Sequence, residues 1–106
     1  MAQSIKLGND VYLDASGVDG IKATLTSGNL NDYYGIHKSG VYSLNETASS
    51  FSNCPQGYST LFVYSGTSGG TQQMIVHRTG VWYRGQSGTP LKWSHWFKLT
   101  GTDTGS

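Results

Sequence analysis

Short apolar segments alternate with polar and glycine-rich turns along the chain. The most apolar segment covers residues 59–64, where Leu61 and Val63 alternate with Phe62 and Tyr64. Because apolar side chains fall on both faces of this segment, it is predicted to be a central strand of a sheet. The other segments with strand character are 40–44, 72–78, 81–84 and 91–100. Their succession, with short turns between them, predicts an antiparallel meander.

The N-terminal part of the chain has shorter apolar segments and fewer aromatic residues than the rest. It carries three short segments with strand character, which are 4–7, 11–13 and 21–25. Its one aromatic residue is Tyr12, so these segments can bury little apolar surface by themselves. We therefore expect residues 1–29 to be linker strands or the end of a preceding segment, residues 30–101 to form a compact domain, and residues 102–106 to be a flexible tail.

One short helical turn is predicted at the start of the compact part. Asn29 is a favourable N-cap for a turn over residues 30–34, and Gly35 ends that turn. Together with the strands, this gives the expected fold class, which is mainly β. The architecture we expect is an antiparallel meander or sandwich-like knob with one short helical turn.

The segments 72–78 and 81–84 are predicted to form a hairpin. We place a two-residue loop at Thr79 and Gly80, because glycine tolerates the positive φ that such turns require. One face of this hairpin then carries Met74, Val76, Val81 and Tyr83, and we expect it to be the core side. The other face carries Ile75, His77, Trp82 and Arg84. This second face is amphipathic and is interpreted as a binding surface or a subunit contact.

Two tryptophans mark the last predicted strand. Trp93 and Trp96 lie three positions apart, so their side chains are expected on opposite faces of the strand. We expect Trp93 to lie in the core. Trp96 then covers the other side, either as structural cover or a subunit contact, or as a platform on which a sugar ring stacks.

The predicted ligand-binding residues are Trp82, Arg84, His77 and Trp96. An arginine beside an aromatic ring can stack on it and donate hydrogen bonds to an acidic or hydroxyl-rich ligand. The structural alternatives stay open. Arg84 can fold over Trp82 and close the sheet surface, and His77 can be a partly buried, hydrogen-bonded residue.

Composition narrows the classes of function. The chain has 106 residues, enough for one domain, of which 12% are charged, and its formal net charge is +1. Its seven scattered Lys and Arg residues do not supply the basic surface that binding to nucleic acid needs. The longest run of non-polar and aromatic residues, 61–64, is far too short to span a bilayer, so we expect no membrane insertion.

No residues stand out as catalytic or metal-binding. The single cysteine, Cys54, excludes an intramolecular disulfide, and no His spacing marks it as a nucleophile. The spacing of His37, His77 and His95 does not fit a zinc site, so no metal and no cofactor are expected. Five Asp and one Glu could include the carboxylate pair of a glycosidase, but no pattern marks such a pair. We expect a protein that is not an enzyme.

Five short motifs follow one another between residues 30 and 101. They are Leu30-Asn31-Asp32, Gly40-Val41-Tyr42, Pro55-Gln56-Gly57, Trp82-Tyr83-Arg84 and Trp93-x-x-Trp96-x-x-Leu99. In order and spacing they resemble the pyocin-knob type domain, which is found near the C-terminus of bacteriophage tail fibres, tailspikes and bacteriocin fibres. The chain departs from that pattern in a longer polar stretch at 45–53 and in His95 between the two tryptophans.

The resemblance implies a homotrimeric tail-fibre domain that adheres to the host by binding a bacterial cell-surface polysaccharide. Such a protein is made in the bacterial cytoplasm and works in the virion tail, outside the cell. Residues 1–29 then correspond to the end of a preceding fibre segment. Two alternatives remain, a purely structural domain that caps or trimerises a fibre and a carbohydrate-processing enzyme domain.

Overall fold

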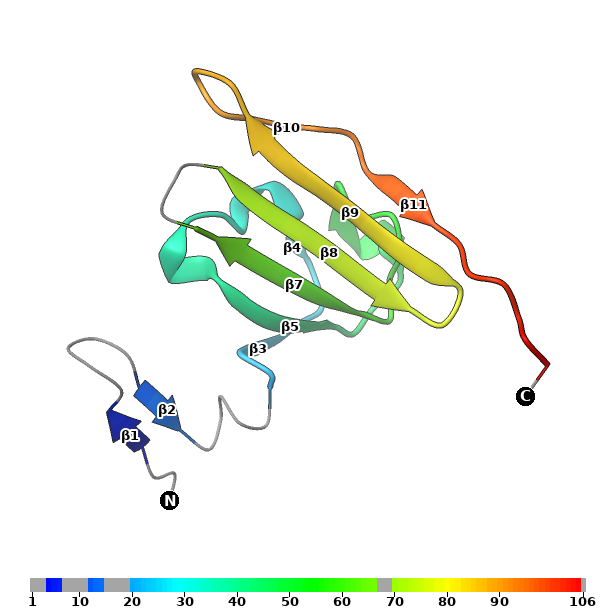
Figure 1. The fold of residues 1–106 in the computed structure, drawn as a ribbon, viewed down its shortest axis with the longest axis horizontal. Coiled ribbons are helices and arrows are strands. Elements are labelled where there is room, and N and C mark those ends of the chain that lie inside the picture. The colour runs from blue at the N-terminus through cyan, green and yellow to red at the C-terminus, as the bar shows by residue number, and fades with distance from the viewer. Residues whose placement is uncertain (1–3, 7–11, 15–19, 67–69, 106) are drawn as a thin grey trace.

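A single large sheet forms the body of the chain (Figure 1). The computed structural model describes residues 4–6, 12–14, 20–66 and 70–105, with side chains from residue 20 onward. The strands of the large sheet are β3 (Ala23–Leu25), β5 (Gly40–Leu44), β7 (Ser59–Ser65), β8 (Thr71–His77), β9 (Gly80–Ser87), β10 (Lys92–Trp93) and β11 (Phe97–Leu99). Their spatial order is β10-β9-β8-β7-β5-β3, and β11 also pairs with β9. The expected mainly β fold is confirmed.

The predicted meander is the centre of this sheet. β5, β7, β8 and β9 pair antiparallel, each with the next. The predicted strand at 40–44 coincides with β5, and β7 lies between β5 and β8, as expected for a strand with apolar residues on both faces. β3 extends the sheet by pairing parallel to β5.

A layer of short elements covers one face of the sheet, which we call the inner face. Most of these elements lie behind the sheet in Figure 1, and the turn over residues 36–38 lies beside the end of β7. They are β4 (Gly28–Asn29) and β6 (Phe51–Ser52), which pair with each other, and the 3-10 turns η1 (Leu30–Asp32), η2 (Ile36–Lys38) and η3 (Ala48–Ser50). The buried core between this layer and the sheet consists of Leu30, Tyr42, Leu44, Phe51, Leu61, Val63, Ile75 and Trp82.

The predicted helical turn is present as η1. The side chain of Asn29 accepts a hydrogen bond from the backbone N–H of Asn31 at 2.9 Å, as expected for an N-cap. The turn ends at Asp32, two residues earlier than predicted. Two further turns, η2 and η3, were not predicted, because neither carries a side-chain cap that would have marked it in the sequence.

The N-terminal segments divide into two groups. β1 (Ser4–Lys6) and β2 (Tyr12–Asp14) form a separate antiparallel pair, and the predicted strand positions 7 and 11 lie outside the described residues. The third segment belongs to the large sheet, because β3 pairs with β5 and β4 pairs with β6. Residues 23–25 and 28–29, which precede the predicted boundary, thus pair with strands that follow it.

The hairpin between β8 and β9 turns one residue earlier than predicted. His77 pairs with Gly80, so the two-residue loop is Arg78 and Thr79. The ring nitrogen Nδ1 of His77 accepts the backbone N–H of Thr79 at 3.2 Å. Gly80 lies in β9, where an added Cβ would stand 2.9 Å from the carbonyl oxygen of Leu99. The glycine therefore permits close approach of the neighbouring strand, a role that the turn prediction did not consider.

The roles predicted for the two hairpin faces are reversed. Moving the loop by one residue changes the cross-strand pairing by two positions, so Ile75 is now opposite Trp82. An even change of pairing keeps each predicted set of side chains on one face. Ile75 is fully buried on the inner face, whereas Met74 and Tyr83 on the other face are 39% and 43% exposed. The reason is the layer of short elements, which packs on the Ile75 side. The face predicted as core is the outer face of the sheet.

A β-bulge changes the last predicted strand. Trp93 pairs with Gln86, the backbone N–H of Ser94 donates to Gly85 O at 2.8 Å, and Phe97 then pairs with Tyr83. Residues 95–96 thus stand opposite a single residue of β9, which is the defining feature of a bulge. The extra residue brings Trp96 to the same side as Trp93, so the prediction that they point to opposite faces is wrong.

The turn after β6 tests the packing of the inner layer. A Cβ at Gly57 would collide with the backbone of Glu46 and lie 2.6 Å from the backbone nitrogen of Ala48. Gly57→Ala is therefore expected to lower the free energy of unfolding by at least about 2 kcal/mol, through overpacking against main chain that cannot move aside. Gly101→Ala is the matched control, since a Cβ there meets nothing within 4 Å. Equal stabilities of the two variants in chemical denaturation would contradict this packing.

Candidate functional site

The structure brings the four predicted ligand-binding residues together in two pairs. The rings of His77 and Trp82 have centroids 6.5 Å apart, and Arg84 lies beside Trp96. Trp82 and Arg84 are buried on the inner face, with 8% and 4% of their surfaces exposed. Trp96 is half-buried beside Arg84, and His77 is partly exposed at the end of β8. Burial leaves Trp82 and Arg84 without the open surface that stacking with a sugar needs, so their predicted ligand role is not supported.

Two indole rings hold the Arg84 guanidinium. Its central carbon lies 4.2 Å from the centroid of the Trp93 ring and 4.6 Å from that of Trp96. Both distances are within the range of cation–π attraction, which is strongest where the cation is removed from water. The sequence interpretation had instead stacked Arg84 on Trp82. The cation near Trp82 is Lys98, whose Nζ lies 4.8 Å from the ring centroid.

A buried glutamine links Arg84 to the inner layer. Arg84 Nε donates to Gln73 Oε1 at 2.9 Å. The amide nitrogen of Gln73 donates to the carbonyl oxygens of Leu30 at 2.8 Å and Tyr33 at 2.9 Å, at the start and the end of η1. The Leu30 carbonyl also accepts the backbone N–H of Tyr33 at 3.3 Å, so the Gln73 amide adds a second hydrogen bond there and a further one at Tyr33. These two bonds hold the turn to the sheet.

The two indole N–H groups make the same kind of connection. Trp93 Nε1 donates to Asn31 O at 3.3 Å, and Trp96 Nε1 donates to Asn53 O at 2.9 Å. Asn31 belongs to η1, and Asn53 follows β6. We refer to Gln73, Arg84, Trp93 and Trp96 together as the arginine cluster. It ties both segments of the inner layer to the edge of the sheet.

Burial shifts the ionisation of the two titratable groups here. Loss of solvation lowers the pKa of Arg84 to about 10, which leaves the guanidinium protonated at neutral pH. Burial also raises the pKa of the Cys54 thiol, an effect partly offset by hydrogen bonding to the Gln56 backbone and by the charge of Arg84. Cys54 is therefore a protonated thiol at neutral pH, which makes it a poor nucleophile. The arginine cluster is a structural element.

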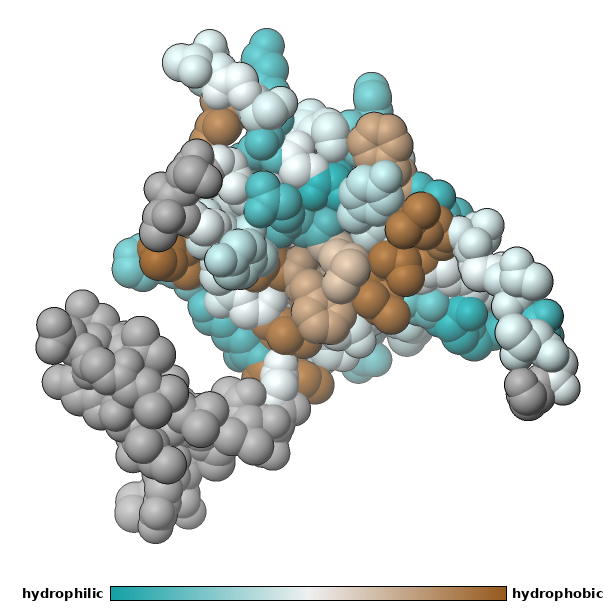
Figure 2. Space-filling view, in the orientation of Figure 1, coloured by the Kyte–Doolittle hydropathy of each residue, from teal (hydrophilic) through white to brown (hydrophobic). Residues whose placement is uncertain are grey.

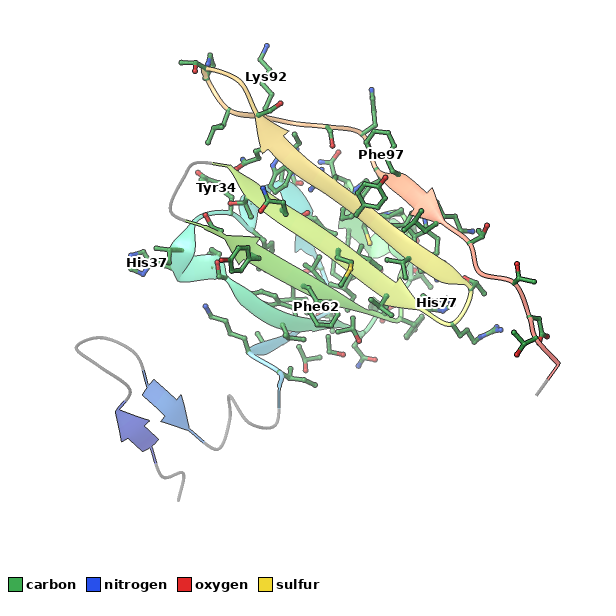
Figure 3. The ribbon with its side chains drawn as sticks, viewed as in Figure 1. Tyr34, His37, Phe62, His77, Lys92 and Phe97 are labelled. Atoms are coloured by element: carbon green, nitrogen blue, oxygen red, sulfur yellow. The ribbon has the colours of Figure 1, made fainter. Side chains whose placement is uncertain are left out.

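An open groove lies at the end of the sheet where β8 turns into β9. Its volume is about 530 Å³, and its lining includes Ser43, Asn45, Tyr58, Thr60, His77 and Arg78. A second hollow of about 610 Å³ lies beside it, and the same His77 and Arg78 line both. Figure 3 shows His77 at this end of the sheet, far from Tyr34 and Lys92 at the other end. Of the predicted residues, His77 is the one that lines this groove.

The groove offers groups for non-covalent binding. The Tyr58 side chain is 58% exposed, and its backbone has the unusual φ of +46°, held by a hydrogen bond from its N–H to Glu46 O at 3.0 Å. A non-glycine residue at positive φ is uncommon and is frequently found at binding sites. Arg78 adds a guanidinium on the hairpin loop. An exposed ring, a guanidinium and an amide on one surface suit a hydroxyl-rich ligand.

Sequence reasoning did not single out Tyr58 or Arg78. Arg78 was assigned to a strand pair with Val81, whereas the actual register puts it in the loop. Tyr58 directly follows Pro55-Gln56-Gly57, and an aromatic residue just after a tight turn was the available signal. Arg78 directly follows His77, but Tyr58 could not be joined to them without knowing that the β6–β7 connection reaches the end of β8.

No related protein indicates what the groove binds. Comparison of the chain with protein-family models, curated proteins and solved structures gives no match. Within the described part of the chain, no group of three His, Cys, Asp or Glu side chains could hold a metal ion. No helix among the described residues is long and apolar enough to cross a membrane.

The two neighbouring glutamines of β8 test the structural role of the arginine cluster. Gln73→Ala removes three hydrogen bonds and leaves buried groups unpaired, so it is expected to lower the free energy of unfolding by about 2–4 kcal/mol. Gln72→Ala changes an exposed side chain on the opposite face and should stay within about 0.5 kcal/mol of the parent. Urea denaturation followed by tryptophan fluorescence measures both. A Gln73→Ala variant as stable as Gln72→Ala would contradict the proposed role.

Proposed function

We propose that this chain is a tail-fibre domain of a phage or phage-tail-like bacteriocin that mediates host adhesion by binding a bacterial cell-surface polysaccharide. The observation that carries the proposal is the groove beside the β8–β9 turn, with Tyr58, His77 and Arg78 around it. The ordered motifs between residues 30 and 101 supply the context, a homotrimer in the virion tail. A stable sheet that presents a preformed polar groove suits an adhesion module working outside the cell.

Each groove residue has a defined part in this proposal. The Tyr58 ring provides the face on which a pyranose stacks. Arg78 donates hydrogen bonds to hydroxyl or carboxylate oxygens of the glycan. Nδ1 of His77 is engaged by the backbone N–H of Thr79 at 3.2 Å and by the Thr79 hydroxyl at 2.9 Å, so Nε2 is the ring nitrogen assigned to the ligand.

Affinity for a repeating polymer does not require a deep pocket. The groove is shallow and polar, and a single sugar-binding site of this kind is weak. A fibre with three copies presents three grooves to one polysaccharide, and multivalency raises the apparent affinity by orders of magnitude without new contacts. The homotrimer and the open groove are therefore mutually consistent parts of the proposal.

The enzymatic alternative is less well supported by the same groove. Glycoside hydrolysis uses two carboxyl groups that face one another across the sugar. Among the described residues that line the two hollows, Asp103 is the single carboxylate. The structural alternative, a domain that caps or trimerises a fibre, draws on a different surface, the exposed apolar face of the sheet.

Two substitutions in the groove test the proposal against matched controls at the other end of the sheet. Tyr58→Ala is expected to weaken binding to a purified surface polysaccharide about five- to tenfold, because it removes a stacking contact worth roughly 1 kcal/mol. Arg78→Ala is expected to act in the same direction. Tyr34→Ala and Lys92→Ala remove a similarly exposed tyrosine and cation elsewhere and should leave binding unchanged.

Glycan arrays and biolayer interferometry with the full chain, across a panel of bacterial surface polysaccharides, provide the measurement. Melting temperatures of all four variants control for folding. If the parent chain binds and the groove variants bind equally well, the groove is wrong as the site. If the parent chain binds no polysaccharide in the panel and no bacterial cells, the adhesion proposal fails and the structural alternative gains.

A further inference from the structure

A row of apolar side chains crosses the outer face of the sheet without interruption. Direct strand pairing places Val41 opposite Phe62, Phe62 opposite Met74, Met74 opposite Tyr83, and Tyr83 opposite Phe97. The row therefore spans β5, β7, β8, β9 and β11. Phe62 lies near its middle and Phe97 at its β11 end (Figure 3). Tyr83 and Phe97 stack with ring centroids 5.4 Å apart.

A second row runs beside the first. It consists of Ser43, Thr60, Val76, Val81 and Leu99, which are again paired directly from strand to strand. Neither row contains a charged residue. Figure 2 shows apolar side chains gathered over the middle of the sheet and toward β11. We refer to the two rows together as the outer apolar face.

The exposed area of this face is large enough for a protein interface. Its six largest apolar side chains are between 36% and 59% exposed, and they are Phe62, Met74, Val76, Tyr83, Phe97 and Leu99. At about 200 Å² for a fully exposed large side chain, they present roughly 500 Å² of apolar surface. A standard-size interface buries about 800 Å² per partner, of which a little over half is apolar. The outer apolar face alone provides about that apolar share.

The apolar residues on both faces of the strands indicate that protein packs against both faces of the sheet. β7 alternates Leu61 and Val63, which are buried inside, with Phe62 and Tyr64, which are exposed outside. A strand that faces water on one side normally carries polar residues there, and apolar residues on both sides are typical of strands covered twice. The inner layer of this chain covers one side only. In the described part of a single copy, no layer packs against the outer face.

We infer that the outer apolar face packs against the outer apolar faces of other copies of this chain in a closed symmetric oligomer. A flat face without charges meets an identical face with no electrostatic penalty, and rotational symmetry lets several flat sheets enclose a common apolar interior. A glycan is a poor occupant, because the two rows offer few hydrogen-bonding groups to a polyhydroxylated ligand. The inference does not require that the groove bind a ligand, although Ser43, Thr60 and Val76 belong to both surfaces. It takes from the proposed function only the expected number of three copies.

The mass of the full chain in solution tests this inference. Multi-angle light scattering at micromolar concentration is expected to give three times the chain mass. Met74→Glu or Phe62→Glu places a like charge at every copy of the interface, and either variant should weaken association at least tenfold. Tyr34→Glu is the matched control outside the two rows and should keep the parent mass. Circular dichroism of each variant checks that the sheet is intact.

A charge-pair experiment keeps the test valid if a glutamate variant unfolds when alone. Copies with Met74→Glu mixed with copies with Met74→Lys should associate more tightly than either variant alone. A parent oligomer that persists in all row variants would show that another surface holds it, and would overturn the inference while leaving the homotrimer possible. A monomeric parent chain would overturn both, yet leave polysaccharide binding at the groove intact. Loss of polysaccharide binding in row variants of unchanged mass would assign the face to the glycan and also overturn the inference.

Discussion

The buried guanidinium of the arginine cluster, which has no carboxylate partner among the described residues, is the constraint around which this structure is arranged. Removing such a charge from water costs several kcal/mol unless its environment compensates. Here the compensation comes from two indole faces and from Gln73, whose amide in turn holds both ends of the η1 turn. The bulge in the last strand is the local feature that makes this possible, because it brings Trp96 to the same side as Trp93. The layer that covers the inner face is held by hydrogen bonds at its edge in addition to apolar packing.

Once the inner face is committed to structure, the surfaces left for function are the outer face and the ends of the strands. The polar groove lies at one end, where the β8–β9 loop and the β6–β7 connection meet. The apolar rows lie across the outer face. The two surfaces adjoin, since Ser43, Thr60 and Val76 belong to the second row and also line the groove. They differ in chemistry, because the groove adds Tyr58, His77 and Arg78 and the rows carry no charged residue. An adhesion domain that works as an oligomer needs both kinds of surface, one for the ligand and one for its own copies.

Much of the fold followed from periodicity, and little of the site did. The alternation in 59–64 correctly identified a central strand, and Asn29 correctly marked the cap of a helical turn. The choice of inner face failed, because apolar residues occupy both faces of β8 and β9 and no local signal tells which face the chain itself will cover. The Trp93–Trp96 prediction failed because one extra residue in a strand inverts every later side chain. Among the groove residues, His77 was named in advance. Arg78 was missed because the hairpin loop was placed one residue too late, and Tyr58 because its place beside His77 depends on tertiary contact.

The environment of the Arg84 side chain is the most direct test of this account. In a ¹H–¹⁵N spectrum, the Nε–H proton of Arg84 is expected at a position shifted by the ring currents of two indoles. Its exchange with solvent should be slow, because it is buried and bonded to Gln73. A signal at the position of a free arginine side chain, lost rapidly to exchange, would contradict the buried cluster and with it the assignment of the inner face.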